Sequence, residues 1–140
     1  MGLSSLNKVL VGGCFDVLHW GHIFFLKKAK KYGDILVVLL ESDKSVQQLK
    51  GKNRPIHSQK KRKEMLLALR SVDEVIALKG ILLDQDYERL IQSLKPQVIV
   101  ATLGDPILEK KRVQAARAGI KFVAVKKLAT PSTRELKIFL

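Results

Sequence analysis

Two histidines, His19 and His22, are the residues of this sequence best placed to do chemistry. They lie in a turn between an apolar run, residues 8–12, and a helical run, residues 23–31. Residues three apart fall on one side of a helical turn, and the first N–H groups of a helix carry partial positive charge. Two imidazoles beside a helix N-terminus can bind phosphate and stabilise the charge that develops on a phosphorus under attack. The motif therefore predicts phosphoryl or nucleotidyl transfer.

The residues around the two histidines support the same interpretation. Gly12 and Gly13 precede them, and glycine allows a backbone to approach a ligand closely. A single histidine is more often an ordinary surface or core residue, but the pair and the glycines together favour a functional site. A zinc site is the alternative, and Cys14 and His57 are the only other ligands of the usual nitrogen or sulfur kind in the sequence.

Length and composition narrow the class of protein. A chain of 140 residues fits one domain, residues 1–140, with an adequate core. No apolar run is long enough for a transmembrane helix, and the N-terminal residues lack the apolar stretch of a signal peptide. The single cysteine cannot form an internal disulfide, which suits a reducing compartment, so we expect a cytoplasmic protein.

Most of the net charge of +13 lies in residues 1–70, the half that contains the histidines. A positive field there would attract triphosphates and phosphorylated substrates. The same charge leaves open a different class of function, a basic nucleic-acid-binding module or a nucleotide sensor without catalysis. We consider nucleic acid a less favoured partner, because the sequence has no aromatic stacking motif and no helix-turn-helix pattern.

Short β-like runs alternate with helical runs along the chain. Apolar runs predict strands at residues 8–12, 35–40, 74–77, 98–101 and 121–125. Helical patterns predict helices at residues 23–31, 59–70, 86–94, 107–118 and 132–140, whereas residues 41–58 are expected to be irregular. Strands joined by helical crossovers form a parallel sheet with helices on both faces. The predicted fold is therefore α/β, a Rossmann-like three-layer sandwich around a five-stranded parallel sheet.

Specific residues mark the helix ends and faces. Ser58 is a predicted N-cap, Gly119 a predicted C-terminal cap, and Ser132 begins a capping-box pattern. Met65, Leu66 and Leu69 are expected on the inner face of their helix, and Trp20 is expected to be a packing residue. In a sheet of this kind ligands bind at the carboxyl ends of the strands, near the switch in strand order.

The segment from Asp16 to His22 resembles the HxGH signature of the cytidylyltransferase-like nucleotidyltransferases. Within that superfamily, residues 41–46, 49–51 and 54–56 resemble the adenylyltransferase domain of bacterial ADP-heptose synthase. Residues 62–69 and 72–76 fit both that group and glycerol-3-phosphate cytidylyltransferase. The resemblance covers residues 8–138, nearly the whole chain.

The resemblance implies an in-line transfer without a covalent enzyme intermediate. A phosphate oxygen of the acceptor attacks the α-phosphorus of ATP or CTP, and pyrophosphate leaves. Mg²⁺ would accompany the triphosphate, held by phosphate oxygens, and no residue is predicted to ligate metal. The acceptor is expected to be a phosphorylated small molecule, and the protein a homodimer.

Roles follow for residues that match the family's motifs. The implied catalytic residues are His19, His22, Lys50 and Arg62, the last because its planar guanidinium suits phosphate oxygens. Implied nucleotide contacts come from Gly12, Gly13, Cys14, Phe15, Asp16, His19, Gly21, His22, Gly104, Asp105, Thr130, Ser132 and Thr133. Implied acceptor contacts come from Asp16, Lys50 and Lys127.

Two segments depart from both subfamilies. Residues 102–106 lack the lysine and the aromatic residue that the heptose enzymes carry after the fourth strand. Lys127 stands where the glycerol-phosphate enzymes have arginine, and Thr130-Pro131 also differ. Because such loops select base and acceptor, several substrates stay open. ATP with heptose 1-phosphate is favoured, and glycerol-3-phosphate cytidylyltransferase and FMN adenylyltransferase activities are the alternatives.

Overall fold

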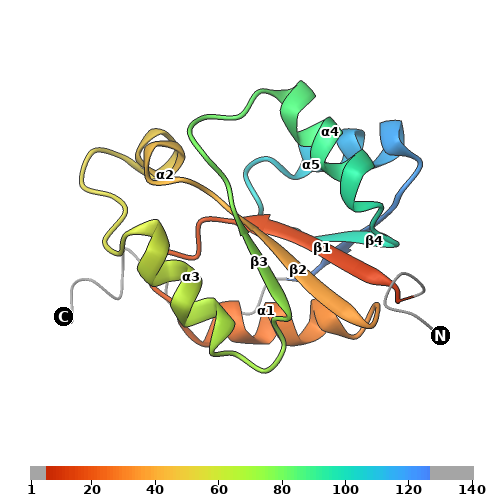
Figure 1. Ribbon diagram of the computed structural model, residues 1–140, viewed down its shortest axis with the longest axis horizontal. Coiled ribbons are helices and arrows are strands. Elements are labelled where there is room, and N and C mark those ends of the chain that lie inside the picture. The colour runs from red at the N-terminus through yellow and green to blue at the C-terminus, as the bar shows by residue number, and fades with distance from the viewer. Residues whose placement is uncertain (1–5, 127–140) are drawn as a thin grey trace.

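The computed structural model describes residues 6–126. Five parallel strands form one sheet in the order β3-β2-β1-β4-β5 (Figure 1). The strands are β1 (Lys8–Gly13), β2 (Ile35–Leu40), β3 (Glu74–Ala77), β4 (Val98–Thr102) and β5 (Lys121–Val125). All five predicted strands are present, and β1 and β4 are each one residue longer than predicted. The order places β1, which leads into the histidines, at the centre of the sheet.

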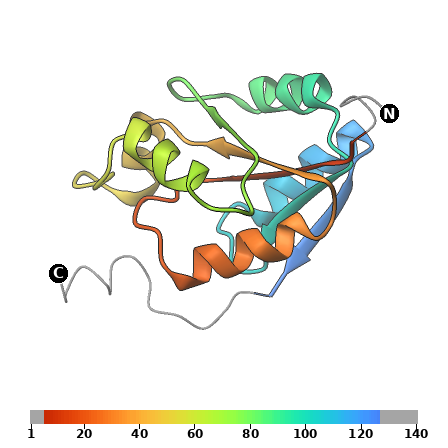
Figure 2. The same ribbon diagram turned by 60° about the horizontal axis from the view of Figure 1, so that its bottom comes forward.

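Two helices cover each face of the sheet. The first layer contains α1 (Trp20–Lys30) and α3 (Gln59–Leu67), and the second contains α4 (Asp84–Leu94) and α5 (Leu108–Ala118). Figure 2 shows the sheet between these two layers. The Rossmann-like three-layer α/β sandwich predicted from the sequence is therefore confirmed.

Alternate strand residues point to opposite faces and build two hydrophobic cores. Val9 and Val11 pack beneath the first helix layer, where Leu26 of α1 and Leu66 of α3 are fully buried. Leu10 packs on the other face in a second cluster, which the helices of the second layer cover. The central strand is apolar on both faces because both are buried.

The strand pairing opens the sheet at one end. β1 pairs with β2 along its whole length, from Lys8–Ile35 to Gly13–Leu40. It pairs with β4 only at Val9–Val98 and Leu10–Ile99. Beyond Leu10 the carboxyl ends of β1 and β4 are therefore no longer paired with each other. The strand order switches at this opening, because the chain continues from β1 to β2 on one side, whereas β4 lies on the other side of β1.

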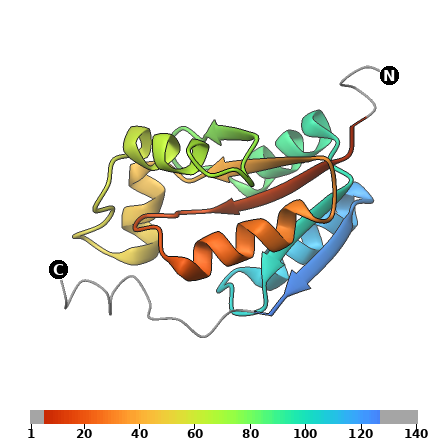
Figure 3. The ribbon, with the colours of Figure 1, turned by 90° about the horizontal axis from the view of Figure 1, so that it is seen from below.

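The prediction that residues 41–58 are irregular is wrong for α2 (Asp43–Lys50). Ser42 caps this helix, and its Oγ accepts a hydrogen bond from the Ser45 amide at 3.1 Å. The helix has eight residues, and Val46 is its one buried apolar side chain, so it lacks the apolar repeat that marks longer helices. Figure 3 shows α2 and the loop after it at the end of the sheet where β1 and β2 finish.

Two predicted caps are confirmed, and two predicted packing positions are wrong. Ser58 Oγ accepts from the Lys61 amide, and Gly119 ends α5 with φ +70°. Met65 is 38% exposed and Trp20 60% exposed, because both lie on outward faces of their helices. The helix predicted at residues 132–140 lies outside the described residues.

Candidate functional site

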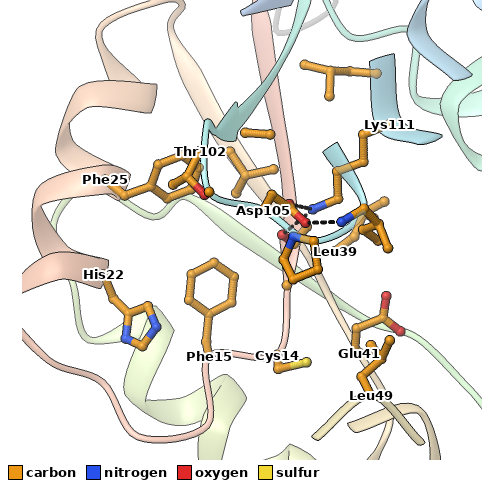
Figure 4. Close-up of a pocket in the computed structure, with 18 of the residues that line it drawn as sticks. Cys14, Phe15, His22, Phe25, Leu39, Glu41, Leu49, Thr102, Asp105 and Lys111 are labelled. Atoms are coloured by element: carbon orange, nitrogen blue, oxygen red, sulfur yellow. Dashed lines mark hydrogen bonds and ion pairs between the residues drawn. The ribbon is translucent and has the colours of Figure 1, made fainter. Parts of the chain in front are cut away.

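A pocket of about 400 Å³ lies where the ends of β1 and β4 separate. Many of the predicted site residues line it, namely Gly12, Gly13, Cys14, Phe15, Asp16, His19, Gly21, His22, Lys50, Gly104 and Asp105. In Figure 4, His22 and Phe25 lie on one side of the pocket and Glu41 and Leu49 on the other. The structure thus brings residues from four separate chain segments to one cavity at the carboxyl end of the sheet.

The two histidines form a capping box at the start of α1. His19 is the N-cap, with extended backbone, and its Nδ1 accepts from the Gly21 amide at 3.1 Å. His22 Nδ1 accepts from the His19 amide at 3.3 Å. The ring centroids lie 4.0 Å apart. Because Nδ1 of each ring accepts an N–H, the neutral ring carries its proton on Nε2. The helix thus begins at Trp20, three residues earlier than predicted.

Gly13 and Phe15 shape the turn before the histidines. Phe15 adopts a positive φ of 45°, and its ring meets that of His22 edge-on at 5.5 Å. A Cβ on Gly13 would lie 2.9 Å from the Phe15 ring, closer than atoms can pack. Gly13 is therefore needed at this position to let the Phe15 ring fold back beside His22.

Asp16 fixes the loop after α2. Its Oδ2 accepts from Arg54 Nε at 2.6 Å and from the Ile56 amide at 2.7 Å, and its Oδ1 accepts from the His57 amide at 2.9 Å. Burial alone would raise the pKa of Asp16, but these hydrogen bonds together hold it below the ordinary 3.8. The predicted ligand-binding carboxylate thus lines the pocket while its oxygens anchor protein groups.

The lowered pKa of Asp16 predicts a pH-dependent stability. An ionised carboxylate with a lowered folded-state pKa stabilises the fold above its unfolded pKa, and the contribution disappears as the pH falls through the folded value. We expect Asp16→Asn to lower the Tm at neutral pH, and the deficit to shrink as the pH falls below about 4, the ordinary pKa of an aspartate. Thermal denaturation at several pH values measures it, with surface-exposed Asp84→Asn as the control. A deficit independent of pH would contradict the assignment.

Arg62 does not line the pocket, which corrects the prediction that it contacts phosphate. Its side chain is fully buried. Nη1 donates to the carbonyls of Cys14 at 2.8 Å and Glu41 at 2.9 Å, and Nε donates to the carbonyl of His57 at 3.0 Å. Nη2 donates to Asp43 Oδ1 at 2.7 Å. The guanidinium joins the ends of β1 and β2 to α2 and α3, which is a structural role.

Glu41 was not predicted as a site residue, although it lines the pocket. It is buried, and its two carboxylate oxygens accept from Tyr87 Oη at 2.6 Å and Ser45 Oγ at 2.7 Å. Burial and the Glu41 carboxylate raise the pKa of Tyr87, so the phenol stays protonated and donates. Burial likewise raises the pKa of the Cys14 thiol, so it is protonated at neutral pH and unsuited to act as a nucleophile.

Lys111 is a second pocket residue that was not predicted from the sequence. Its Nζ donates to Asp105 Oδ2 at 2.6 Å and to the Gly12 carbonyl at 3.2 Å (Figure 4). Asp105 Oδ1 accepts from the Ile107 amide at 2.9 Å, closing the turn before α5. The sequence signal that could have indicated it is a lysine about one and a half helical turns after the Gly104-Asp105 pair. Lys111 is one of four lysines that line the pocket, with Lys50, Lys110 and Lys126.

The remaining site predictions concern metal binding and residues outside the described part of the chain. Lys127, Thr130, Ser132 and Thr133 lie outside it. Within residues 6–126, no group of three or more His, Cys, Asp or Glu side chains is arranged to hold a metal ion. Over the same range, no helix is both long and apolar enough to cross a bilayer.

A sequence model described as cytidylyltransferase-like matches residues 10–138. The chain belongs to the cytidylyltransferase-like family. This membership confirms the resemblance found in the HxGH signature and the predicted class of enzyme, a nucleotidyltransferase. The site described above is thus the part of a cytidylyltransferase-like domain that carries the signature histidines.

Similar curated proteins include the bifunctional protein HldE of Campylobacter fetus and of Helicobacter pylori, 49% and 48% identical over 98 residues. These alignments cover 69% and 70% of this chain but 20% of each relative, so the chain spans about a fifth of their length.

Solved structures share the fold of this chain. A lipopolysaccharide core biosynthesis protein from Thermoplasma volcanium is 31% identical with a TM-score of 0.72, covering 89% of this chain and 99% of that one. A pantoate-beta-alanine ligase from Francisella tularensis has a TM-score of 0.62 over 92% of this chain and 62% of that one; at 16% identity it supports the fold alone.

Proposed function

We propose that this domain transfers a nucleoside monophosphate from ATP or CTP to the phosphate of a small molecule, with release of pyrophosphate. The observation that carries the proposal is the histidine pair at the start of α1, which lines the pocket at the switch in strand order. Two imidazoles and a helix N-terminus directed at one cavity form a site for a polyphosphate. The family of the chain supports the same reaction.

In the proposed reaction an oxygen of the acceptor phosphate forms a bond to the α-phosphorus. The bond from that phosphorus to the oxygen of the β-phosphate breaks, and pyrophosphate leaves with the electron pair. The Nε2–H groups of His19 and His22 would donate to the phosphate oxygens, which gain charge in the transition state. Lys50 and Lys111 would add positive charge at the opposite wall. No protein nucleophile is required, which suits the protonated thiol of Cys14.

Mg²⁺ fits this site as part of the nucleotide substrate. The three carboxylates that line the pocket are engaged by the protein: Asp16 with the loop of residues 54–57, Glu41 with Tyr87 and Ser45, and Asp105 with Lys111. Among residues 6–126 no acidic cluster forms a metal cage. Phosphate oxygens would therefore supply the ligands, and the metal would neutralise part of the triphosphate charge.

The favoured acceptor is a sugar phosphate, and heptose 1-phosphate is the first to test. The resemblance of residues 41–46, 49–51 and 54–56 to the ADP-heptose synthase domain and the similarity to HldE over 98 residues support this choice. Glycerol 3-phosphate and FMN are the alternatives within the family, because residues 102–106 depart from the heptose pattern.

A pyrophosphate-release screen tests the proposal. It crosses ATP and CTP, each with Mg²⁺, against heptose 1-phosphate, glycerol 3-phosphate, FMN and choline phosphate. We expect release only when both a nucleotide and a phosphorylated acceptor are present, with ATP and heptose 1-phosphate the best pair. Salt-sensitive binding to many oligonucleotides, with no release from any pair, would contradict the proposal and favour a nucleic-acid-binding module.

A further inference from the structure

The pocket extends beyond the histidines to the opposite face of the sheet. Its walls there come from the strand residues that face the second helix layer and from α4 and α5; we call this part the α4/α5 lobe, lined by Leu10, Leu39, Tyr87, Ile91, Ile99, Ala101 and Gln114. The histidines lie on the other side of β1, at the start of α1. Transfer at the phosphorus requires none of the lobe residues, so the lobe is available to another part of a substrate.

Gln114 is the uncharged polar residue of α5 that lines the pocket, where Lys110 and Lys111 of the same helix also lie. It is 8% exposed, lines the pocket and lies one residue before Ala115, which is fully buried against the sheet. Among the residues that the structure describes, none hydrogen-bonds with its side-chain amide. A buried amide without a partner destabilises a fold, and such groups in native proteins call for an explanation. A ligand group in the lobe would supply the missing partner.

The chemistry of the lobe favours an uncharged, hydroxylated group. Its walls are mostly apolar, the nearby Lys111 ammonium is already paired with Asp105, and the buried Glu41 carboxylate at its edge disfavours a second phosphate there. Glu41 already accepts from Tyr87 and Ser45, and each carboxylate oxygen has room for a further donor. An amide that both donates and accepts, a carboxylate that accepts, and apolar surface between them match the hydroxyls and C–H faces of a sugar.

We propose that the α4/α5 lobe binds the sugar body of the acceptor, and that Gln114 selects the acceptor by hydrogen-bonding one of its hydroxyls. This inference rests on the proposed transfer reaction, in which the phosphates lie at the histidines and the nucleotide near Gly104 and Asp105. Gln114 is then a specificity-determining residue, and its unpaired amide in the free protein is the cost of that specificity.

Gln114→Met keeps the length of the side chain and removes both hydrogen-bonding groups. We expect it to weaken heptose 1-phosphate binding about tenfold, measured by calorimetry with the sugar phosphate alone. MgATP binding should stay within about twofold. The Tm should stay equal or rise by about 3 °C, because an unpaired amide is removed from the interior. Gln92→Met, on the exposed side of α4, is the matched control and should change neither binding constant.

The outcomes separate this inference from the proposed reaction. Weakened sugar-phosphate binding without loss of stability supports the lobe assignment, even if the wild-type domain released no pyrophosphate with any acceptor. Weakened MgATP binding instead would assign the lobe to the nucleobase and overturn the inference. A large fall in Tm, or unchanged binding of both ligands, would overturn it as well by showing that Gln114 has only a structural role or none.

Discussion

Asparagine in place of His19 or His22 is expected to lower kcat for pyrophosphate release by about 10²–10³. In the proposed reaction each imidazole donates to the nucleotidyl group as it gains negative charge, so we expect its loss to affect the transition state more than binding. Asparagine is the informative replacement because its side-chain oxygen can accept the backbone N–H that Nδ1 accepts in the capping box. The start of α1 is thereby preserved while the Nε2 donor is removed.

The control for this prediction is His57→Asn. His57 is the third histidine of the chain, and its side chain does not line the pocket. We expect its kcat to match wild type. The Tm of each of the three variants should stay close to the wild-type value. Wild-type kcat in both His19→Asn and His22→Asn would refute the assignment of catalysis to this pair.

Arg62→Leu is expected to lower the free energy of unfolding by about 3–5 kcal/mol. Three carbonyls, those of Cys14, Glu41 and His57, would lose their donor, and each unpaired buried group costs about 1–3 kcal/mol. Because those carbonyls lie at the ends of β1 and β2 and before α3, the loss would also loosen the pocket. Urea denaturation followed by circular dichroism measures the change.

Arg70→Leu is the matched control, since Arg70 is exposed just beyond α3. Its free energy of unfolding should change by less than about 0.5 kcal/mol. Arg62→Lys should fall between Arg62→Leu and wild type, because one ammonium group cannot reach every partner of the guanidinium fork. A fully stable Arg62→Leu that lost only activity would show that Arg62 contacts phosphate after all.

The sequence predicted the fold well because its strands are uniform. Residues 35–40 form one apolar run, which a strand buried on both faces requires. Helix α2 was missed for the opposite reason. Only Val46 among its eight residues is a buried apolar side chain, and Ser42, its cap, is one small polar residue among several.

The site residues that lie close together in the sequence were predicted, whereas the roles that depend on tertiary contacts were not. His19 and His22 are three residues apart, so their spacing alone placed both at one helix start. Arg62 was misassigned because an arginine suited to phosphate is equally suited to buried carbonyls, and only the fold shows which it meets. Gln114 and Lys111 are separated from the histidines by some 90 residues, so only the fold shows that they share a cavity with them.

The proposed attack at the α-phosphorus can be tested most directly by following isotopic label from the nucleotide. The wild-type domain is incubated with the best acceptor of the screen and with ATP or CTP labelled at either the α- or the γ-phosphate. We predict that α-label appears in a nucleotide-linked acceptor and γ-label in pyrophosphate, in equal amounts. Transfer of γ-label to the acceptor, or its release as inorganic phosphate, would contradict the account.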